Sequence, residues 1–358
     1  MERRRRFDDR PGEEAGLHLS DPFDLVAESR RDAARSAVAA AFGRVVVGCL
    51  EPVATGASAA NYRLEIAGRP YLLRLESPRR DEVRDPQRAY ACMKLAADAG
   101  LAPPLRHADP VAGVAITDFL PARPLSEHPG GGPGLMQALG ALVRRLQAMP
   151  RFPAVAADHL TILDRNFERL LATGLFAPGL LDRHRAGFDR IREAYRWDAA
   201  GLVASHNDLN PHNILFDGER LWLIDWETAY GNDPLVDPAT LILFLADSRE
   251  LELALVRACL GREPDRRVLA RLALARLLVR FFYGCASSLN AAHGLQNAVP
   301  EIDLAAPTRS EFAALLRRRG MSDGAPEAQR LVGKMALAGF LAGVEAPAFE
   351  ETLAVVRD

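Results

Sequence analysis

Lysine is nearly absent from this chain of 358 residues: Lys94 and Lys334 are the only two, and arginine supplies the other basic side chains. Lysine and arginine together number 45 against 47 acidic residues, so the formal net charge is −2 and gives no bulk attraction for nucleic acid. No apolar run in the sequence is long enough to span a bilayer. We therefore expect neither a nucleic-acid partner nor a membrane partner.

Cysteine is also scarce, and Cys49, Cys92, Cys259 and Cys285 occur singly, without the close pairs of a zinc site or a redox dithiol. We interpret them as small apolar core residues. The first residues, MERRRRFDDRPGEEAG, lack the apolar segment of a secretory signal and are too acidic for an organelle transit peptide. We expect a cytoplasmic protein whose residues 1–24 form a disordered tail.

The length of the chain exceeds the size at which one hydrophobic core usually stops growing, which favours two lobes. After a helix over residues 25–42, β-branched and aromatic residues predict strands over residues 45–53, 61–66 and 71–76, the last two as a hairpin. A helix over residues 88–99 and a strand over residues 114–119 follow. Residues 25–120 therefore read as a small mixed lobe.

The second predicted lobe, residues 121–358, is mostly helical. The sequence PGGGPG at residues 129–134 is a breaker cluster that precedes a helix over residues 135–149. One β-hairpin interrupts the helices, with strands over residues 213–216 and 221–224 joined at Asp217-Gly218. The predicted fold class is thus α+β, with an antiparallel sheet and a helix in the first lobe.

The segment most informative about chemistry is HNDLNPHNILFDGERLWLIDWE, residues 206–227, which brackets this hairpin. Its H-x-D-x-x-x-x-N loop and following Asp are typical of phosphoryl transfer, which needs a carboxylate to orient and deprotonate the acceptor hydroxyl. Asp208 fits that role. Mg²⁺ needs oxygen ligands beside the phosphates, and Asn213 and Asp225 fit because the hairpin returns its second strand next to its first. The alternative, that these residues only cap turns, explains a single pair better than the whole set.

These residues resemble the aminoglycoside phosphotransferase and choline kinase superfamily, whose loop reads H-G-D-x-x-x-x-N followed by I-D-[WF]-E. The matching residues here are His206, Asp208, Asn213, Ile224, Asp225, Trp226 and Glu227. The resemblance implies a bilobal protein-kinase-like fold, ATP and Mg²⁺ as cofactors, and a small-molecule hydroxyl acceptor. It also implies that His206 supports the catalytic loop and that Glu227 contributes to a second metal position.

Three short strings are similar to those of choline and ethanolamine kinases in particular: HND at residue 206, YLLRL at residues 71–75 and FLPARPL at residues 119–125. A kinase of this type needs a cation that reaches the nucleotide phosphates from an interior strand. Because no lysine precedes Lys94, we expect Arg74 to supply it, with Leu73 and Leu75 facing the other way. In the family a helix glutamate pairs with that cation, but Ala89 occupies the corresponding position.

The remaining nucleotide contacts are predicted from position. The small residues of TGASAAN at residues 55–61, among them Thr55, Gly56 and Ser58, suit a loop whose backbone N–H groups approach phosphate oxygens, although a plain loop would read similarly. Asp118, Phe119 and Leu120 lie where the backbone between the lobes usually binds adenine.

The acceptor is predicted less directly. Asp233 and Asp237, in GNDPLVDP, are candidates to attract an amine, and cation–π faces are available from Trp226, Tyr230, Phe281, Phe282 and Tyr283. The alternative is that Asp237 caps a helix and the aromatic rings are core. The leading hypothesis is a kinase for an amino alcohol of the choline or ethanolamine type. The rivals are a kinase for an aminoglycoside, thiamine or another metabolite, and a pseudokinase that binds nucleotide without turnover.

Overall fold

The computed structural model describes residues 21–53, 59–77, 85–153, 155, 157–295 and 299–357. Thr55, Gly56 and Ser58 of the predicted phosphate loop lie outside these residues, as does most of the predicted tail. The end of that tail needs correction, because Pro22–Leu25 form the 3-10 helix η1 and Phe23 is buried. The side chain of Asp21 accepts a hydrogen bond from the Phe23 N–H and so starts this helix.

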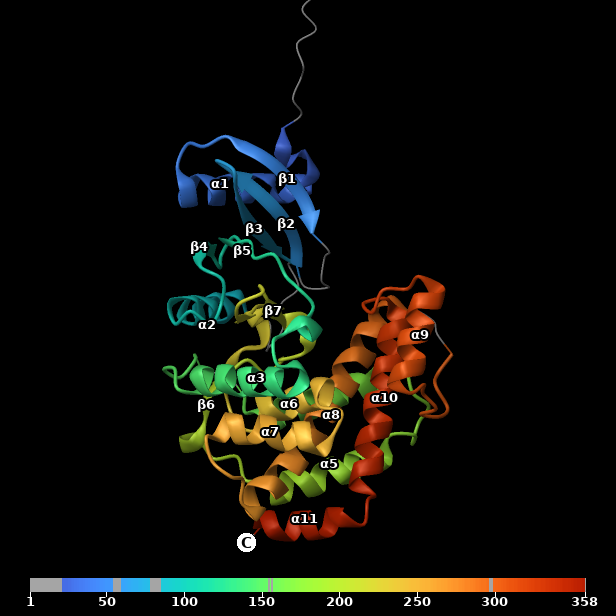
Figure 1. Cartoon of the computed structure of the whole chain (residues 1–358). Coiled ribbons are helices and arrows are strands. Elements are labelled where there is room, and N and C mark those ends of the chain that lie inside the picture. Colours follow the sequence, from blue (N-terminus) through green and yellow to red (C-terminus); the bar gives the residue numbers. More distant parts are fainter. Residues whose placement is uncertain are drawn as a thin grey trace, which may run out of the picture.

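A five-stranded antiparallel sheet, in the order β1-β2-β3-β5-β4, forms the first part of the chain (Figure 1). Its strands are β1 Val47–Val53, β2 Ala59–Ile66, β3 Arg69–Glu76, β4 Leu105–Asp109 and β5 Val114–Asp118. Four of them confirm predicted strands. The fifth, β4, was not predicted because its sequence LRHAD has no alternating apolar pattern and none of its residues is fully buried.

Alternation along β3 gives the sheet two different faces. Leu73 and Leu75 are buried with α1 Glu28–Phe42, which covers one face. Arg74 points to the opposite face, as predicted, and lines a cavity there. The sheet therefore has an apolar face closed by a helix and a second face available for a ligand.

The helix α2, Pro86–Asp98, connects this sheet to the rest of the molecule. The side chain of Asp85 caps its first turn by accepting from the Gln87 N–H. Tyr90 and Met93 pack into a core shared with Leu139 of α3, Gly131–Gln147, and Phe216 of the predicted hairpin. Packing across the two parts of the chain thus fixes α2 against the segment that carries the catalytic motif.

The remaining chain is mostly helical, and the α+β class is confirmed. Helix α3 begins at Gly131, inside the predicted breaker, since Pro133 is tolerated in a first helical turn. The β7–β8 hairpin has the predicted Asp217-Gly218 turn, with Gly218 at φ 103°. The other elements are η2 Leu125–Glu127, α3 Gly131–Gln147, α4 His159–Ala172, α5 Asp182–Ala194, η3 Ala199–Gly201, β6 Val203–Ser205, η4 Pro211–Asn213, β7 Ile214–Phe216, β8 Leu221–Leu223, η5 Trp226–Thr228, β9 Tyr230–Asn232, α6 Val236–Leu245, α7 Arg249–Leu260, α8 Arg266–Gly294, α9 Arg309–Arg319, α10 Pro326–Val344 and α11 Ala348–Arg357.

The 29-residue helix α8 is the centre of the helical part, and α4, α5, α10 and α11 share a core with it. In Figure 1, α9 and the upper part of α10 project from one side of this body. Within the described chain, no single helix is long and apolar enough to cross a membrane; α10 and α11, bent by 77° at their junction, meet the length and composition test only as a pair.

Candidate active site

The catalytic loop between β6 and η4 is held by a buried carboxylate. Asp237 is fully buried and accepts hydrogen bonds from the backbone N–H of His206 at 3.0 Å, the N–H of Asn207 at 2.9 Å and the Ser205 hydroxyl at 2.9 Å. Asn207 has a left-handed φ of 66°, a conformation that asparagine adopts more readily than most residues. Asp237 therefore shapes the loop, and this placement replaces its predicted substrate role.

Asp208 follows this anchored turn and is surrounded by donors. Its carboxylate accepts from Asn210 Nδ2 at 2.9 Å, from Asn213 Nδ2 at 3.0 Å and from the Tyr283 hydroxyl of α8. Burial raises the pKa of Asp208, with a smaller contribution from the charge of Asp225. Burial and the Asp208 charge raise the pKa of Tyr283 well above its ordinary value, so its hydroxyl remains a donor.

His206 supports this loop from beneath. It is fully buried, its Nε2 lies 2.9 Å from the Ile224 carbonyl, and its backbone carbonyl accepts from the Thr228 hydroxyl at 3.0 Å. Its ring is 4.8 Å from that of Trp226, which in turn packs edge-on against Phe152. These contacts place His206 in the framework of the loop, outside the lining of the cavity.

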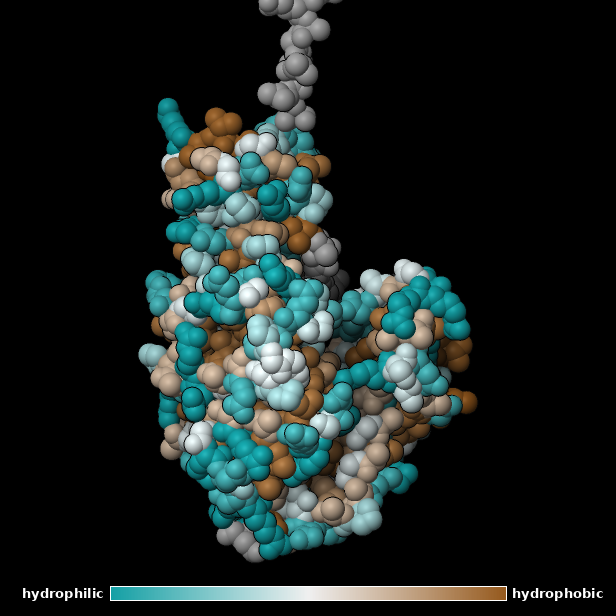
Figure 2. Space-filling model, viewed as in Figure 1, coloured by the Kyte–Doolittle hydropathy of each residue, from teal (hydrophilic) through white to brown (hydrophobic). Residues whose placement is uncertain are grey.

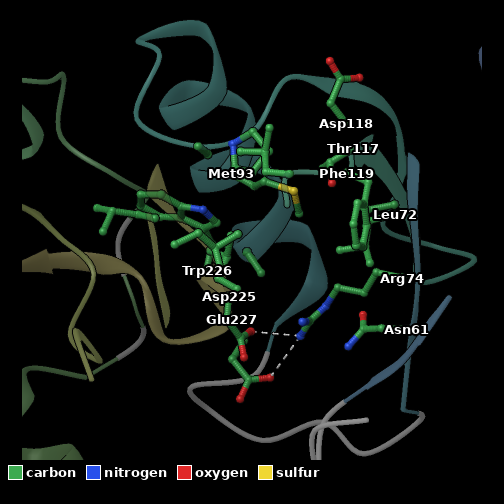
Figure 3. A pocket seen from close by; sticks show the side chains of 18 of the residues that line it. Asn61, Leu72, Arg74, Met93, Thr117, Asp118, Phe119, Asp225, Trp226 and Glu227 are labelled. Atoms are coloured by element: carbon green, nitrogen blue, oxygen red, sulfur yellow. Dashed lines mark hydrogen bonds and ion pairs between the residues drawn. The ribbon is translucent and has the colours of Figure 1, made fainter. Parts of the chain in front are cut away.

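The hairpin brings the three predicted metal residues to one region. The Ile224 N–H donates to the Asn213 carbonyl at 3.0 Å, which sets Asn213 beside Asp225. Asp225 has φ 63° and ψ 71°, a left-handed conformation that is uncommon for a residue with a side chain and is often found at functional sites. Glu227 follows on η5, and its carboxylate lies on the same side of the cavity (Figure 3).

This set of oxygens fits Mg²⁺ bound together with a nucleotide. Among the residues the structure describes, no group of three or more His, Cys, Asp and Glu could hold a metal by itself. Mg²⁺ typically takes one or two protein carboxylates and completes its shell with phosphate oxygens and water. The amide nitrogen of Asn213 donates to Asp208, so its amide oxygen would be the atom that faces a metal ion together with the two carboxylates.

Arg74 faces these carboxylates across the cavity, as Figure 3 shows. Its NH2 atom is 2.9 Å from Asp225 Oδ1 and 3.8 Å from Glu227 Oε2, and its Nε donates to Glu76 Oε1 at 2.7 Å. Although burial opposes the charge, Asp225 and Glu76 raise the pKa of Arg74 above its ordinary value. Glu76 also accepts from the Tyr90 hydroxyl of α2 at 3.4 Å.

The absent helix glutamate is therefore compensated from the strand itself. Glu76, two residues after Arg74, supplies a carboxylate that Tyr90 connects to α2. Arg88 of α2 is buried and donates to the Ala229 and Glu227 carbonyls, each at 3.0 Å. The sequence pattern predicts no role for Glu76, Arg88 or Tyr90. Glu76 lies two residues after Arg74 and therefore on the same face of the strand, and this position could have indicated that the two side chains pair.

The cavity between the sheet and the hairpin has a volume of about 300 Å³. Apolar side chains line its inner part, namely those of Leu72, Met93, Ala115, Leu215 and Leu223. Asp118, Phe119 and Leu120, the residues predicted to border adenine, also line it. The N–H groups of Asp118 and Phe119 already donate to Pro104 and Pro70, whereas that of Leu120 has no acceptor within the described segments. A flat heterocycle would find an apolar slot here and one free backbone donor.

The other predicted substrate residues are placed elsewhere. Tyr230 is buried and its hydroxyl lies 2.7 Å from His159 Nδ1. Asp233 is buried and forms an ion pair with Arg271. Trp226 is only 3% exposed, although it contributes to the lining of the cavity. All three side chains are thus buried, and this placement replaces their predicted contact with the acceptor.

Comparison with known proteins gives a family match and similar folds. The sequence matches the phosphotransferase enzyme family over residues 50–273. It is 57% identical to the protein LicA of Haemophilus influenzae over 41 residues, which are 12% of this chain and 15% of that protein. The chain thus aligns with only a small part of this relative.

Solved structures resemble the whole fold. A choline/ethanolamine kinase family protein from Mesorhizobium loti has a TM-score of 0.65 at 22% identity, covering 92% of this chain and 99% of that one. The choline kinase LicA from Streptococcus pneumoniae has a TM-score of 0.60 at 13% identity, covering 87% and 99%. The kinase-like fold predicted from the sequence is confirmed.

Proposed function

Because the chain belongs to the phosphotransferase enzyme family, we propose that it is an ATP- and Mg²⁺-dependent kinase that phosphorylates a hydroxyl of a small amine-bearing metabolite, of the choline or ethanolamine type. One observation carries this proposal. Asp208 is held by donors just before the first strand of the hairpin, and the cluster of Arg74, Asp225 and Glu227 lies just after its second strand, at the same open end. A base and a phosphate site are thus assembled side by side.

The nucleotide site follows from the cavity. The adenine ring would occupy the apolar slot and accept from the Leu120 N–H. Arg74 would turn from Asp225 to the phosphates, since a guanidinium binds phosphate oxygens in the same bidentate way as carboxylate oxygens. Asn213, Asp225 and Glu227 would hold Mg²⁺, which supplies charge neutralisation at the phosphates when bound. Arg74 and Glu76 would then keep the phosphate chain aligned with Asp208.

Asp208 acts on the acceptor. Its raised pKa makes the carboxylate a better proton acceptor than a solvated aspartate. Asn210, Asn213 and Tyr283 fix its orientation, so one oxygen can receive the hydroxyl proton as the phosphoryl group transfers. Asp237 keeps the backbone of the loop in place during this step.

The acceptor side is aromatic next to Asp208. Tyr283 packs edge-on against Phe244 with ring centroids 5.0 Å apart and against Phe282 at 5.4 Å. Aromatic faces attract ammonium groups, which supports an amine-bearing acceptor. An aminoglycoside, thiamine or other metabolite is the alternative within the same chemistry. A pseudokinase is less well supported, because the base, the metal residues and the phosphate cation are all present.

The test is transfer of label from γ-labelled ATP, with Mg²⁺, to a panel of amino alcohols, aminoglycosides and thiamine. We expect one labelled small-molecule product, formed in proportion to enzyme. Binding of ATP without any labelled product across the panel would support the pseudokinase instead.

A further inference from the structure

Arg280, on α8, is half-buried. Within the described segments of the chain, its guanidinium makes no hydrogen bond and no ion pair. The contrast with Arg271 on the same helix is clear, because that side chain pairs with the buried Asp233. An unpaired cation removed from water costs free energy, so a site that retains one is suited to an anion that the chain itself does not provide.

Two further guanidinium groups lie near Arg280, and both are already engaged. Arg276 is 2.8 Å from Glu252 Oε1. Arg309 donates to the Phe244 carbonyl at 2.9 Å and to the Leu243 carbonyl, at the C-terminal end of α6. Burial lowers the pKa of Arg280, and the positive charges of Arg276 and Arg309 lower it further. In this cluster of Arg276, Arg280 and Arg309, the positive charge without an acceptor among the described residues is therefore that of Arg280.

The fold makes room for this guanidinium. A Cβ atom at Gly339 of α10 would lie 2.7 Å from Arg280 NH1, closer than ordinary contact. Glycine inside a helix is about 1 kcal/mol less favourable than alanine, so its presence here fits a need for space. The Arg280 side chain thus extends from α8 against α10. Figure 2 shows a notch between the body of the molecule and the projection formed by α9 and the upper part of α10.

The cluster adjoins the acceptor side of the catalytic carboxylate. Arg280 precedes Tyr283 by three positions on α8, so the two side chains lie on the same helix face. Tyr283 donates to Asp208. The guanidinium of Arg309 lies 6.0 Å from the ring centroid of Phe244, the same ring that packs against Tyr283. A small molecule at Asp208 would reach this positive surface.

We propose that Arg280, with Arg309 beside it, binds an acidic group of the acceptor, a carboxylate or a phosphate, while the acceptor hydroxyl lies at Asp208. This inference rests on the kinase activity of the proposed function and changes its substrate class from simple amino alcohols to alcohols that also carry an acidic group. A hydroxyl amino acid, which combines an amine, a carboxylate and a hydroxyl, satisfies both the aromatic wall and the arginine cluster.

The experiment compares matched acceptors that differ by the acidic group alone. These are ethanolamine with L-serine, 3-amino-1-propanol with L-homoserine, and glycerol with glycerol 3-phosphate. For wild type we expect a higher kcat/KM for the acidic member of at least one pair, and the pair identifies carboxylate or phosphate. Arg280→Gln should raise the KM for that acceptor about tenfold to a hundredfold, the usual range for losing a hydrogen bond to a charged group. The KM of the matched acceptor without the acidic group should stay unchanged.

Three controls accompany this comparison. Arg280→Lys, which keeps the charge, should restore part of the loss, and Arg69→Gln, at the exposed first position of β3, should change neither KM. If wild type prefers the acceptor without the acidic group in every pair, or if Arg280→Gln changes both members alike, the anion site is excluded while the kinase assignment stands.

If no acceptor is phosphorylated, the proposed function fails, and calorimetric titration with sodium sulfate still decides the site. A heat of sulfate binding that is seen with wild type and Arg69→Gln but lost in Arg280→Gln supports the anion site. Equal heat in wild type and Arg280→Gln overturns it.

Discussion

Arg74 lies within ion-pair distance of the carboxylates of Glu76, Asp225 and Glu227. The cation and the predicted metal ligand Asp225 should contribute differently to catalysis. Arg74→Ala should raise the KM for ATP about tenfold or more, because a charge-assisted contact to phosphate is lost. Asp225→Ala should instead reduce turnover to near background at ordinary Mg²⁺. Titration of ATP and Mg²⁺ for each variant separates the two effects. Wild-type kinetics for Asp225→Ala would remove Asp225 from the metal site.

Tyr283 combines a hydroxyl that orients Asp208 with a ring that borders the acceptor. Tyr283→Phe keeps the ring and removes the donor, so we expect kcat to fall about tenfold with the KM for the acceptor little changed. Tyr283→Leu removes both, and the KM for an amine-bearing acceptor should rise as well. Steady-state kinetics with varied acceptor makes this comparison. Equal effects on KM in both variants would contradict the separate roles.

At the level of single residues, the sequence predicted the groups that belong to one short motif and one strand. The hairpin brings Asp208, Asn213 and Asp225 together, and its turn and strands could be recognised in the sequence. Arg74 faces the cavity because strand alternation determines direction. The hydrogen bonds by which Asp237 holds the loop, and the hydrogen bond from Tyr283 to Asp208, were not predictable. A carboxylate after a loop reads the same whether it is exposed or buried, and Tyr283 meets Asp208 only through the packing of α8.

Among the structural elements, the catalytic loop depends on Asp237 of α6. Asp237→Leu would leave the N–H groups of His206 and Asn207 and the Ser205 hydroxyl without their acceptor. We expect the free energy of unfolding to fall by on the order of 3 kcal/mol, with activity lost. Asp98→Asn, which removes an exposed ion pair with Lys94, is the control and should cost less than about 1 kcal/mol. Urea denaturation measures the free energy of unfolding of both variants. Similar losses in Asp237→Leu and Asp98→Asn would argue against the role of Asp237 in holding the catalytic loop.

Helices α4 and α5 each bury a histidine that is neutral in the fold. Burial lowers the pKa of His159 to about 4 and that of His184 to about 4, below the ordinary 6.5. The unfolded chain therefore binds more protons between these values, and stability should fall as the pH decreases from 6.5 towards 4. The loss is up to roughly 3 kcal/mol for each histidine.

Urea denaturation at pH 7, 5.5 and 4.5 tests this pH dependence. His184→Leu should have a shallower decline than wild type, whereas His293→Gln, at an exposed position of α8, should keep the wild-type slope. A wild-type slope in His184→Leu would show that this histidine does not titrate in the expected way.

The elements themselves were mostly predictable, because glycine and proline mark their ends and the apolar period changes from strand to helix. The exceptions have physical reasons. β4 is short and has no alternating pattern, and α3 starts earlier than predicted since Pro133 is acceptable near a helix N-terminus. The first turn of ordered chain, η1, was assigned to the tail because its one anchor, Phe23, follows a charged and polar segment.

In the molecule as a whole, the site is assembled from segments far apart in the sequence. The sheet supplies Arg74 and Glu76, and the segment after the hairpin supplies Asp225. Helix α2 connects the two parts, because Tyr90 donates to Glu76 and Arg88 donates to the Ala229 carbonyl. A kinase-like α+β fold was expected from the order of the elements and the motif, and the likeness to solved structures confirms that fold class. The network of Arg88, Glu76 and Tyr90, by contrast, required the packing of α2 to become visible.

The central claim is that this chain moves a phosphoryl group from ATP to a small-molecule hydroxyl with Asp208 as the base. The most direct measurement is single-turnover transfer from γ-labelled ATP by wild type and Asp208→Asn, with ATP binding measured on the same samples. We predict equal ATP affinity and a rate lower by about 10²- to 10⁴-fold in the variant. Equal transfer rates in the two proteins, with ATP bound to both, would contradict the account.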